Sequence, residues 1–233
     1  MAQKKLFRFA QIKTFENVLE YPPLIKGKWH SFFKNENPVI LELACGRGEY
    51  TVGLARLHPE ENFIGVDIKG NRMYIGAKTA KEEGLLNAAF LRTQIEKLDQ
   101  YFEKGEVSEI WITFPDPQLR LSKAKKRLTH PRFLRLYNKI LKPGGVIHLK
   151  TDSPQLYDFT LLVCELYGIT VVRNLPDLMS VSGPDPELMI TTHYQSLDIA
   201  KSKQIYYLSF SLPAVLPDLD QKLKDIISNE TTG

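Results

Sequence analysis

Cysteine and long apolar runs are scarce in this chain, and each scarcity excludes a class of protein. Its 233 residues contain two cysteines, Cys45 and Cys164, in different predicted elements. Such a pair excludes a disulfide framework and a cysteine zinc site, and it suits a reducing cytoplasm. No run approaches the roughly 18–20 apolar residues that span a bilayer. The basic N-terminus has no apolar core after it, so we expect no signal peptide.

Acidic residues are absent between Asp116 and Asp152. The same stretch carries ten of the cations: Arg120, Lys123, Lys125, Lys126, Arg127, Arg132, Arg135, Lys139, Lys142 and Lys150. Because the whole chain has a net charge of +4, the residues outside this basic window sum to −6. A field of one sign next to one carboxylate favours a phosphate-bearing partner. The alternative is a solvated lysine-rich helix face, although such faces usually mix both signs.

Short apolar strands alternate with amphipathic helices through most of the chain. The pattern predicts strands at 38–43, 62–67, 88–91, 107–113, 146–150, 169–173 and 203–212. It is typical of an α/β fold with a parallel sheet covered by helices on both faces. We predict a basic, flexible arm over 1–24, a domain over 25–212, and a polar tail over 213–233 with a weak helix around 219–227.

A turn of small residues follows the first predicted strand. The sequence Glu42-Leu43-Ala44-Cys45-Gly46-Arg47-Gly48 lacks the Gly-x-Gly-x-x-Gly pattern of dinucleotide-binding folds. Small residues at such a turn let a ligand approach the backbone. Asp67, which ends the next strand, can accept hydrogen bonds from ribose hydroxyls. The alternatives are a turn required only for packing and an aspartate that caps a helix.

A rigid acidic turn ends the fourth predicted strand. In Phe114-Pro115-Asp116-Pro117, prolines fix the backbone on both sides of one carboxylate. The ends of parallel strands carry the ligand sites of open sheets. Asp116 is therefore a candidate for base recognition or group transfer, and a capped turn is the alternative.

These motifs together resemble one family. The glycine turn resembles that of class I S-adenosylmethionine-dependent methyltransferases, with Ala44 in place of a glycine. In order along the chain, the turn, Gly65-Val66-Asp67-Ile68, Phe-Pro-Asp-Pro, Lys126-Arg127-Leu128, Pro143-Gly144-Gly145 and Lys150-Thr151-Asp152 resemble the tRNA (guanine-N7-)-methyltransferase family. The resemblance implies a Rossmann-like sheet of seven strands, mostly parallel, with one antiparallel strand near the C-terminus.

The resemblance also implies an activity and a set of site residues. It implies methyl transfer from S-adenosylmethionine to N7 of a guanosine in tRNA, at position 46 of the variable loop, without a metal. The implied cofactor residues are Glu42, Gly46, Gly48, Asp67, Gln94 and Asp116, and Asp116 is also the acid of the reaction centre. The implied tRNA-binding residues are Arg120, Asp152, Thr192 and Gln195.

Three glutamines depart from the family pattern. Gln118 stands where the family has tryptophan, Gln94 where it has an acid, and Gln195 where it has glutamate. Two other functions remain open from the sequence. One is a class I methyltransferase that acts on a small molecule or protein, which explains the basic window poorly. The other is an RNA-binding protein that keeps the fold without catalysis.

Overall fold

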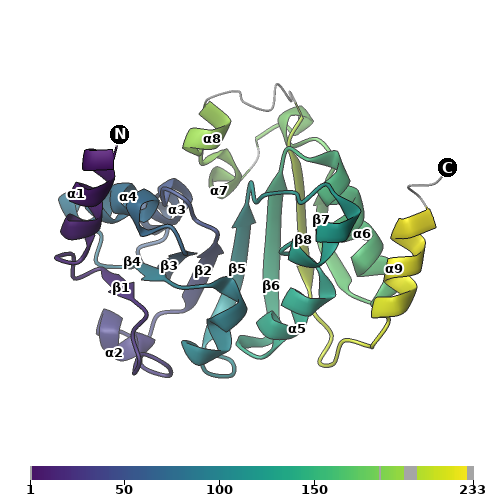
Figure 1. Cartoon of the computed structure of the whole chain (residues 1–233), viewed down its shortest axis with the longest axis horizontal. Coiled ribbons are helices and arrows are strands. Elements are labelled where there is room, and N and C mark those ends of the chain that lie inside the picture. The colour runs from purple at the N-terminus through teal and green to yellow at the C-terminus, as the bar shows by residue number, and fades with distance from the viewer. Residues whose placement is uncertain (1, 184, 197–203, 230–233) are drawn as a thin grey trace.

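The computed structural model describes residues 2–183, 185–196 and 204–229, and an eight-stranded sheet runs through them (Figure 1). Its strands are β1 (Val18–Glu20), β2 (Val39–Leu43), β3 (Asn62–Asp67), β4 (Ala88–Arg92), β5 (Val107–Thr113), β6 (Leu141–Thr151), β7 (Thr170–Leu175) and β8 (Tyr206–Ser211). They lie in the order β1-β4-β3-β2-β5-β6-β8-β7. Only β8 pairs antiparallel among these strands, with β6 and β7. The predicted mostly parallel sheet with one antiparallel strand is therefore confirmed.

Helices cover both faces of the sheet because its central strands are buried on both sides. Along β2, Val39, Leu41 and Leu43 belong to one hydrophobic cluster, whereas Ile40 belongs to the other. The first cluster is covered by α2 (Trp29–Phe33), η1 (Ile95–Gln100), α5 (Pro131–Asn138), α6 (Pro154–Leu166) and α9 (Asp220–Asn229). The second is covered by α3 (Glu49–Leu57) and α4 (Gly70–Glu82). This alternation is the expected consequence of the period of two in a strand.

The N-terminal segment differs from the flexible arm that the sequence predicts over 1–24. Residues Ala2–Ile12 form helix α1, which packs on α4, and Val18–Glu20 add strand β1 beside β4. The physical reason is apolar burial. Ile12 is fully buried, and the ring of Phe15 stacks on Tyr74 with centroids 5.5 Å apart. Strand β1 is also the eighth strand, where the sequence predicts seven.

The C-terminal part of the chain is tied to α5 and to the end of α6 by polar contacts. The weak helix predicted around 219–227 is present as α9, and its Leu223 is buried. Asp220 accepts two hydrogen bonds from Arg135, at 2.7 and 3.0 Å, and one from the Tyr167 hydroxyl at 2.7 Å. Between β7 and β8 lie η3 (Leu178–Ser180), α7 (Pro186–Met189) and α8 (His193–Ser196).

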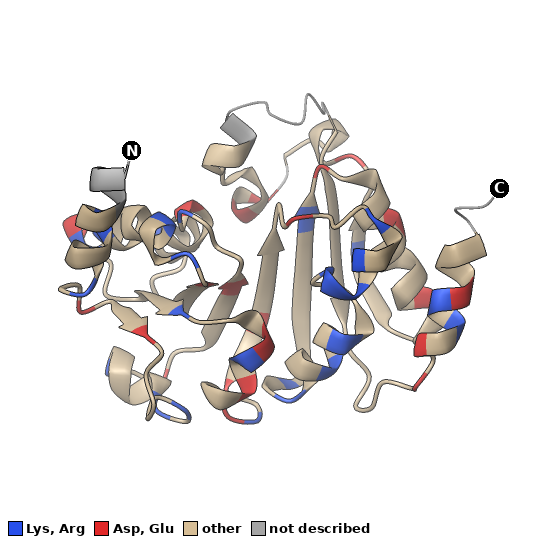
Figure 2. Ribbon diagram, viewed as in Figure 1, with Lys and Arg blue, Asp and Glu red and all other residues tan. Residues whose placement is uncertain are grey.

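The basic window is less free than its charge count indicates. Figure 2 shows Lys and Arg gathered on η2 (Leu121–Lys126) and on α5. Four of the ten cations are nevertheless engaged within the protein. Arg127 is buried with its guanidinium 4.4 Å from the Phe159 ring, Arg135 pairs with Asp220, Lys139 pairs with Asp99, and Lys150 is buried. The other six, which are all exposed, are Arg120, Lys123, Lys125, Lys126, Arg132 and Lys142.

The chain reverses its direction across the sheet between β2 and β5. From β2 it proceeds to β3 and β4 on one side, and it then returns to place β5 on the other side of β2. The loops that follow β2 and β5 therefore diverge and leave a crevice at the carboxyl ends of the strands. Ligands of open α/β sheets bind at such a reversal. The glycine turn follows β2 and the Phe-Pro-Asp-Pro turn follows β5, so the two motifs meet there.

Candidate active site

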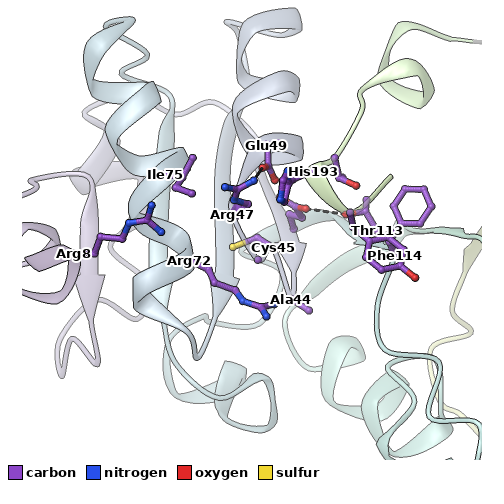
Figure 3. A pocket seen from close by; sticks show the side chains of 14 residues that line it. Arg8, Ala44, Cys45, Arg47, Glu49, Arg72, Ile75, Thr113, Phe114 and His193 are labelled. Atoms are coloured by element: carbon purple, nitrogen blue, oxygen red, sulfur yellow. Dashed lines mark hydrogen bonds and ion pairs between the residues drawn. The ribbon is translucent and has the colours of Figure 1, made fainter. Parts of the chain in front are cut away.

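Two adjoining cavities open at the ends of β2, β3 and β5. The first has a volume of about 440 Å³ and is lined by Glu42, Thr113 and Thr192 among others (Figure 3). The second, of about 360 Å³, is lined by Asp67, Gln94 and Asp116 among others. Both cavities share the lining residues Ala44, Gly46, Arg72 and Phe114. They are therefore two halves of one cleft.

The glycine turn supplies the floor between the two halves. Ala44, Gly46 and Gly48 all adopt positive φ, at 57°, 57° and 76°. A Cβ atom added at Gly46 would meet only the carbonyl of Ala44, at 3.9 Å, and would otherwise enter open space. Because Gly46 lines both cavities, its bare backbone lets a ligand lie directly on the turn.

A single aromatic ring supports this turn from below. The ring of Phe90, which is fully buried, lies against three glycines from three elements. A Cβ atom would approach it to 2.4 Å at Gly48, 2.9 Å at Gly65 and 2.9 Å at Gly76. The Gly76 amide also donates to the Arg47 carbonyl at 2.8 Å, which fixes α4 against the turn. None of these contacts could be foreseen from the spacing of the motif.

Glu42 is a buried carboxylate at the end of β2, as its sequence position predicts. One oxygen accepts from the Thr51 amide at 2.8 Å and from the Thr51 hydroxyl, and the other accepts from the Thr113 hydroxyl at 2.8 Å. Burial raises the pKa of Glu42 from 4.5 to about 7, against the lowering effect of these hydrogen bonds. A ligand with a cationic group in the first cavity would favour the ionised form of Glu42.

Asp67 lies at the end of β3 in the second cavity, with Gln94 across from it at the start of η1. Its two oxygens accept from the amides of Gly46 at 3.0 Å and Lys69 at 2.7 Å. Each carboxylate oxygen retains a further lone pair, so Asp67 can still accept two hydroxyl donors. Asp67 thus serves both the turn and the cavity, and the capping alternative is wrong, because Lys69 is the N-cap residue of α4 and no side chain caps that helix.

Asp116 is exposed and lines the second cavity, together with Lys126 of η2. Its carboxylate accepts from the Gln118 amide at 3.0 Å. The turn is held in an uncommon shape, because Phe114 and Gln118 on either side of it have φ of 45° and 48°. The amide of Phe114 donates to the Lys150 carbonyl at 2.8 Å. The carboxylate is therefore fixed at the cleft rather than placed on a loose loop.

The four residues implied in tRNA binding lie in different surroundings. Thr192 lines the first cavity. Asp152, after β6, forms a hydrogen bond with the Tyr194 side chain, and burial, together with this carboxylate, raises the pKa of Tyr194. Arg120 is exposed before η2 and is not among the residues that line the two cavities. Gln195 belongs to α8, and its side chain lies outside what the structure describes.

Three arginines line the first cavity that sequence reasoning did not assign to it. They are Arg8 of α1, Arg47 of the turn and Arg72 of α4 (Figure 3). Arg8 lies 5.7 Å from the centre of the Tyr74 ring. The signal for Arg8 was the basic N-terminus, but its helical packing on α4 was not visible in the sequence. Arg47 pairs at 3.8 Å with Glu49, which also lines this cavity, so the positive charge at the mouth of the cleft comes from Arg8 and Arg72.

The cleft fits a nucleoside-bearing cofactor, and the comparisons agree on its class. A family model described as "Putative methyltransferase" matches residues 36–208. Among solved structures, the 16S rRNA methyltransferase KamB superposes with a TM-score of 0.61 at 16% identity, covering 80% of this chain and 93% of that one. The 30S ribosomal A1408 methyltransferase from an uncultured bacterium gives a TM-score of 0.58 at 16% identity, covering 78% and 91%. The fold and the glycine turn define a class I methyltransferase.

Similar sequences identify the family within that class. The tRNA (guanine-N(7)-)-methyltransferase of Porphyromonas gingivalis is 49% identical over 228 residues, covering 92% of this chain and 91% of that protein. The enzyme of the same name from Bacteroides thetaiotaomicron is 45% identical, covering 96% and 92%. The chain belongs to the tRNA (guanine-N(7)-)-methyltransferase family, as the motifs predict. Within the described residues, no helix is long and apolar enough to cross a membrane, and no group of side chains has the arrangement of a metal site.

Proposed function

We propose that this chain transfers the methyl group of S-adenosylmethionine to N7 of a guanosine in tRNA, at position 46 of the variable loop. The observation that carries the proposal is the cleft in which Glu42, Asp67 and Asp116 face two adjoining cavities beside a basic surface. Family membership supports the same reaction. The buried free thiols of Cys45 and Cys164 support a reducing cytoplasm as its location.

The residues of the cleft fit the separate parts of the cofactor. In the second cavity, Asp67 would accept hydrogen bonds from the ribose hydroxyls, and the side-chain oxygen of Gln94 would accept one from the adenine amino group. Glu42 would face the amino group of the methionine part in the first cavity. The turn at Gly46 and Gly48 would lie beneath the junction of the two. When bound, the cofactor supplies a methyl group on a sulfonium centre.

The chemistry requires alignment more than proton transfer. Guanine N7 is an acceptor with a free lone pair, so no strong base has to deprotonate it. The protein has to hold the purine within about 3–3.5 Å of the methyl group and in line with it. Methylation leaves a positive charge on the base. The fixed carboxylate of Asp116 would stabilise that charge as it develops, or grip the donor edge of the guanine.

The exposed cations of the basic window would hold the RNA backbone. Lys123, Lys125 and Lys126 of η2 follow the Asp116 turn directly, and Arg120 precedes them. Contacts to phosphate fix the register of a nucleic acid without reading its sequence. Asp152, Thr192 and Gln195 would then contact the nucleotide that enters the cleft.

A methylation assay tests this function directly. Purified protein is incubated with labelled S-adenosylmethionine and unmodified total tRNA, and the nucleosides are then separated. We expect label in 7-methylguanosine, and its loss from a transcript in which the guanosine at position 46 is replaced by adenosine. Label in another nucleoside would contradict the proposal. A protein that binds tRNA but gives no heat with S-adenosylmethionine in calorimetry would instead be a non-catalytic RNA-binding protein.

A further inference from the structure

One wall of the first cavity is built by the segment 186–194, which lies between β7 and β8. Its beginning is the short helix α7, and its end carries Thr192, His193 and Tyr194, which line the cavity. A helix of four residues is not stable alone, because nucleating a turn costs more than its few hydrogen bonds return. The position of this wall must therefore come from contacts with other elements.

Lys150 of β6 provides the first of these contacts. Its side chain is 1% exposed, and Nζ donates to the carbonyls of Leu188 at 2.7 Å and Ile190 at 3.0 Å. The ammonium also lies 5.2 Å and 5.5 Å from the ring centres of Tyr50 and Phe114. No carboxylate pairs with Lys150 in the described part of the chain. A buried cation of this kind is satisfied by the free carbonyls at a helix C-terminus.

Helix α3 provides the second set of contacts, from a different side. The Tyr50 hydroxyl donates to the Glu187 carbonyl at 2.6 Å, and His58 lies 2.7 Å from the Glu187 carboxylate. Gly53 leaves room for Ile190, because a Cβ atom there would lie 2.8 Å from the Ile190 side chain. Helix α7 and the residue after it are thus held between α3 and β6.

Lys150 also joins this wall to the acidic turn. Its backbone carbonyl accepts from Phe114, the residue that precedes Pro115 and Asp116. Farther along the segment, the centres of the Tyr194 and Phe114 rings lie 6.0 Å apart, and the Tyr194 side chain forms a hydrogen bond with Asp152. One buried lysine therefore contacts the segment that carries Thr192 and the turn that carries Asp116.

We propose that Lys150 and Tyr50 are positioning residues that dock the 186–194 segment and thereby set where Thr192 meets the substrate nucleotide. This inference rests on the proposed function, and it extends that function to residues that touch neither cofactor nor RNA. Three of the docking hydrogen bonds are accepted by backbone carbonyls, those of Glu187, Leu188 and Ile190, and the Glu187 carboxylate adds a side-chain contact with His58.

The central test replaces Lys150 by methionine, which keeps the length and apolar stem but removes both hydrogen bonds. We expect kcat/KM for tRNA to fall about tenfold or more, because two charged hydrogen bonds are lost. Tyr50→Phe and Gly53→Ala perturb the same segment from α3, and each should lower kcat/KM in the same direction. Lys222→Met, at an exposed position on α9, is the matched control and should leave kcat/KM unchanged.

Two further readouts separate positioning from general stability. In a double-mutant cycle, the fold-loss of kcat/KM in the Lys150→Met, Thr192→Ala double variant should be smaller than the product of the fold-losses in the two single variants. The reason is that Lys150 acts through the segment that carries Thr192. Hydrogen exchange should be faster in the 186–194 segment of Lys150→Met and unchanged in α6. Multiplicative losses, kcat/KM within twofold of wild type, or unchanged exchange in 186–194 would each overturn the inference.

The same experiments distinguish the two proposals. A wild-type protein that forms no 7-methylguanosine would contradict the proposed function, whereas hydrogen exchange would still report whether Lys150 docks the segment. An active wild-type protein whose Lys150→Met variant keeps full activity would contradict the positioning role alone.

Discussion

The raised pKa of Glu42 makes the stability of the ligand-free protein depend on pH in a way that one substitution removes. Burial raises this pKa from 4.5 to about 7. The folded state therefore holds the proton more tightly than the unfolded state does. The contribution of Glu42 to stability is complete below pH 4.5 and is lost as the pH rises through 7. A shift of this size corresponds to about 3 kcal/mol when the carboxyl is fully ionised.

The pH dependence can be isolated with Glu42→Gln, which cannot ionise. Its amide still accepts from the Thr113 hydroxyl but faces the Thr51 amide poorly, so the variant loses some stability at every pH. That loss is constant and cancels when two pH values are compared. From pH 5 to pH 8, the free energy of unfolding of the wild type should fall by about 2.5 kcal/mol relative to the variant.

Urea unfolding without cofactor, at several pH values from 5 to 8, measures this difference. Thr51→Val serves as the control, because it removes one hydroxyl donor to Glu42 while leaving the carboxyl free to ionise. A wild-type curve that stays parallel to that of Glu42→Gln within about 0.5 kcal/mol would refute the reasoning. It would mean that the hydrogen bonds from Thr51 and Thr113 fully offset the effect of burial on the pKa of Glu42.

Three further predictions concern the cleft and the basic surface. Asp67→Ala should weaken S-adenosylmethionine binding by about 1.5–3 kcal/mol in calorimetry, with a smaller effect on tRNA binding; equal affinity for the cofactor would contradict its role. Asp116→Asn should fold and bind cofactor but lose most of its turnover. A rate within twofold of wild type would show that Asp116 only stabilises the turn. Replacing Lys123 and Lys125 together by alanine should reduce the magnitude of the slope of log K for tRNA binding against log salt concentration by about 1.4–1.8. An unchanged slope would mean that these lysines are solvated and do not contact the RNA.

Most of the fold could be predicted because each central strand is an apolar run with a clear end. Strands β3 and β5 have the bounds that the pattern predicts. Strand β1 was missed because three half-buried residues carry no readable alternation. Helix α1 was missed because its few buried residues are spread among cations, and its partner α4 lies some 60 residues away in sequence.

The site could be predicted where a motif is tied to the end of a strand. Glu42 and Asp67 lie in the last residues of β2 and β3, and Asp116 follows β5, so the fold brings all three to one cleft at the carboxyl ends of these strands. Lys150 could not be assigned in the same way. Its partners are backbone carbonyls of a distant segment, and a carbonyl leaves no residue type to recognise. All ten cations of the basic window looked available because the partners of the engaged ones, such as Asp220 for Arg135 and Asp99 for Lys139, are distant in sequence.

The ring of Phe90 beneath the glycine turn has a consequence for how this protein can be altered. Gly48, Gly65 and Gly76 come from three separate stretches of the chain, and a side chain at any of them would meet this ring; a Cβ atom would also meet the Thr51 hydroxyl at Gly65 and the Arg47 carbonyl at Gly76. Phe90 and the three glycines are therefore sterically coupled. A chimera that imports β4 with a smaller residue at position 90 would leave a void under the turn, and one that imports a larger residue at position 76 would push the ring upward. Exchange between relatives should succeed when all four positions travel together, and recombination that separates them should fail.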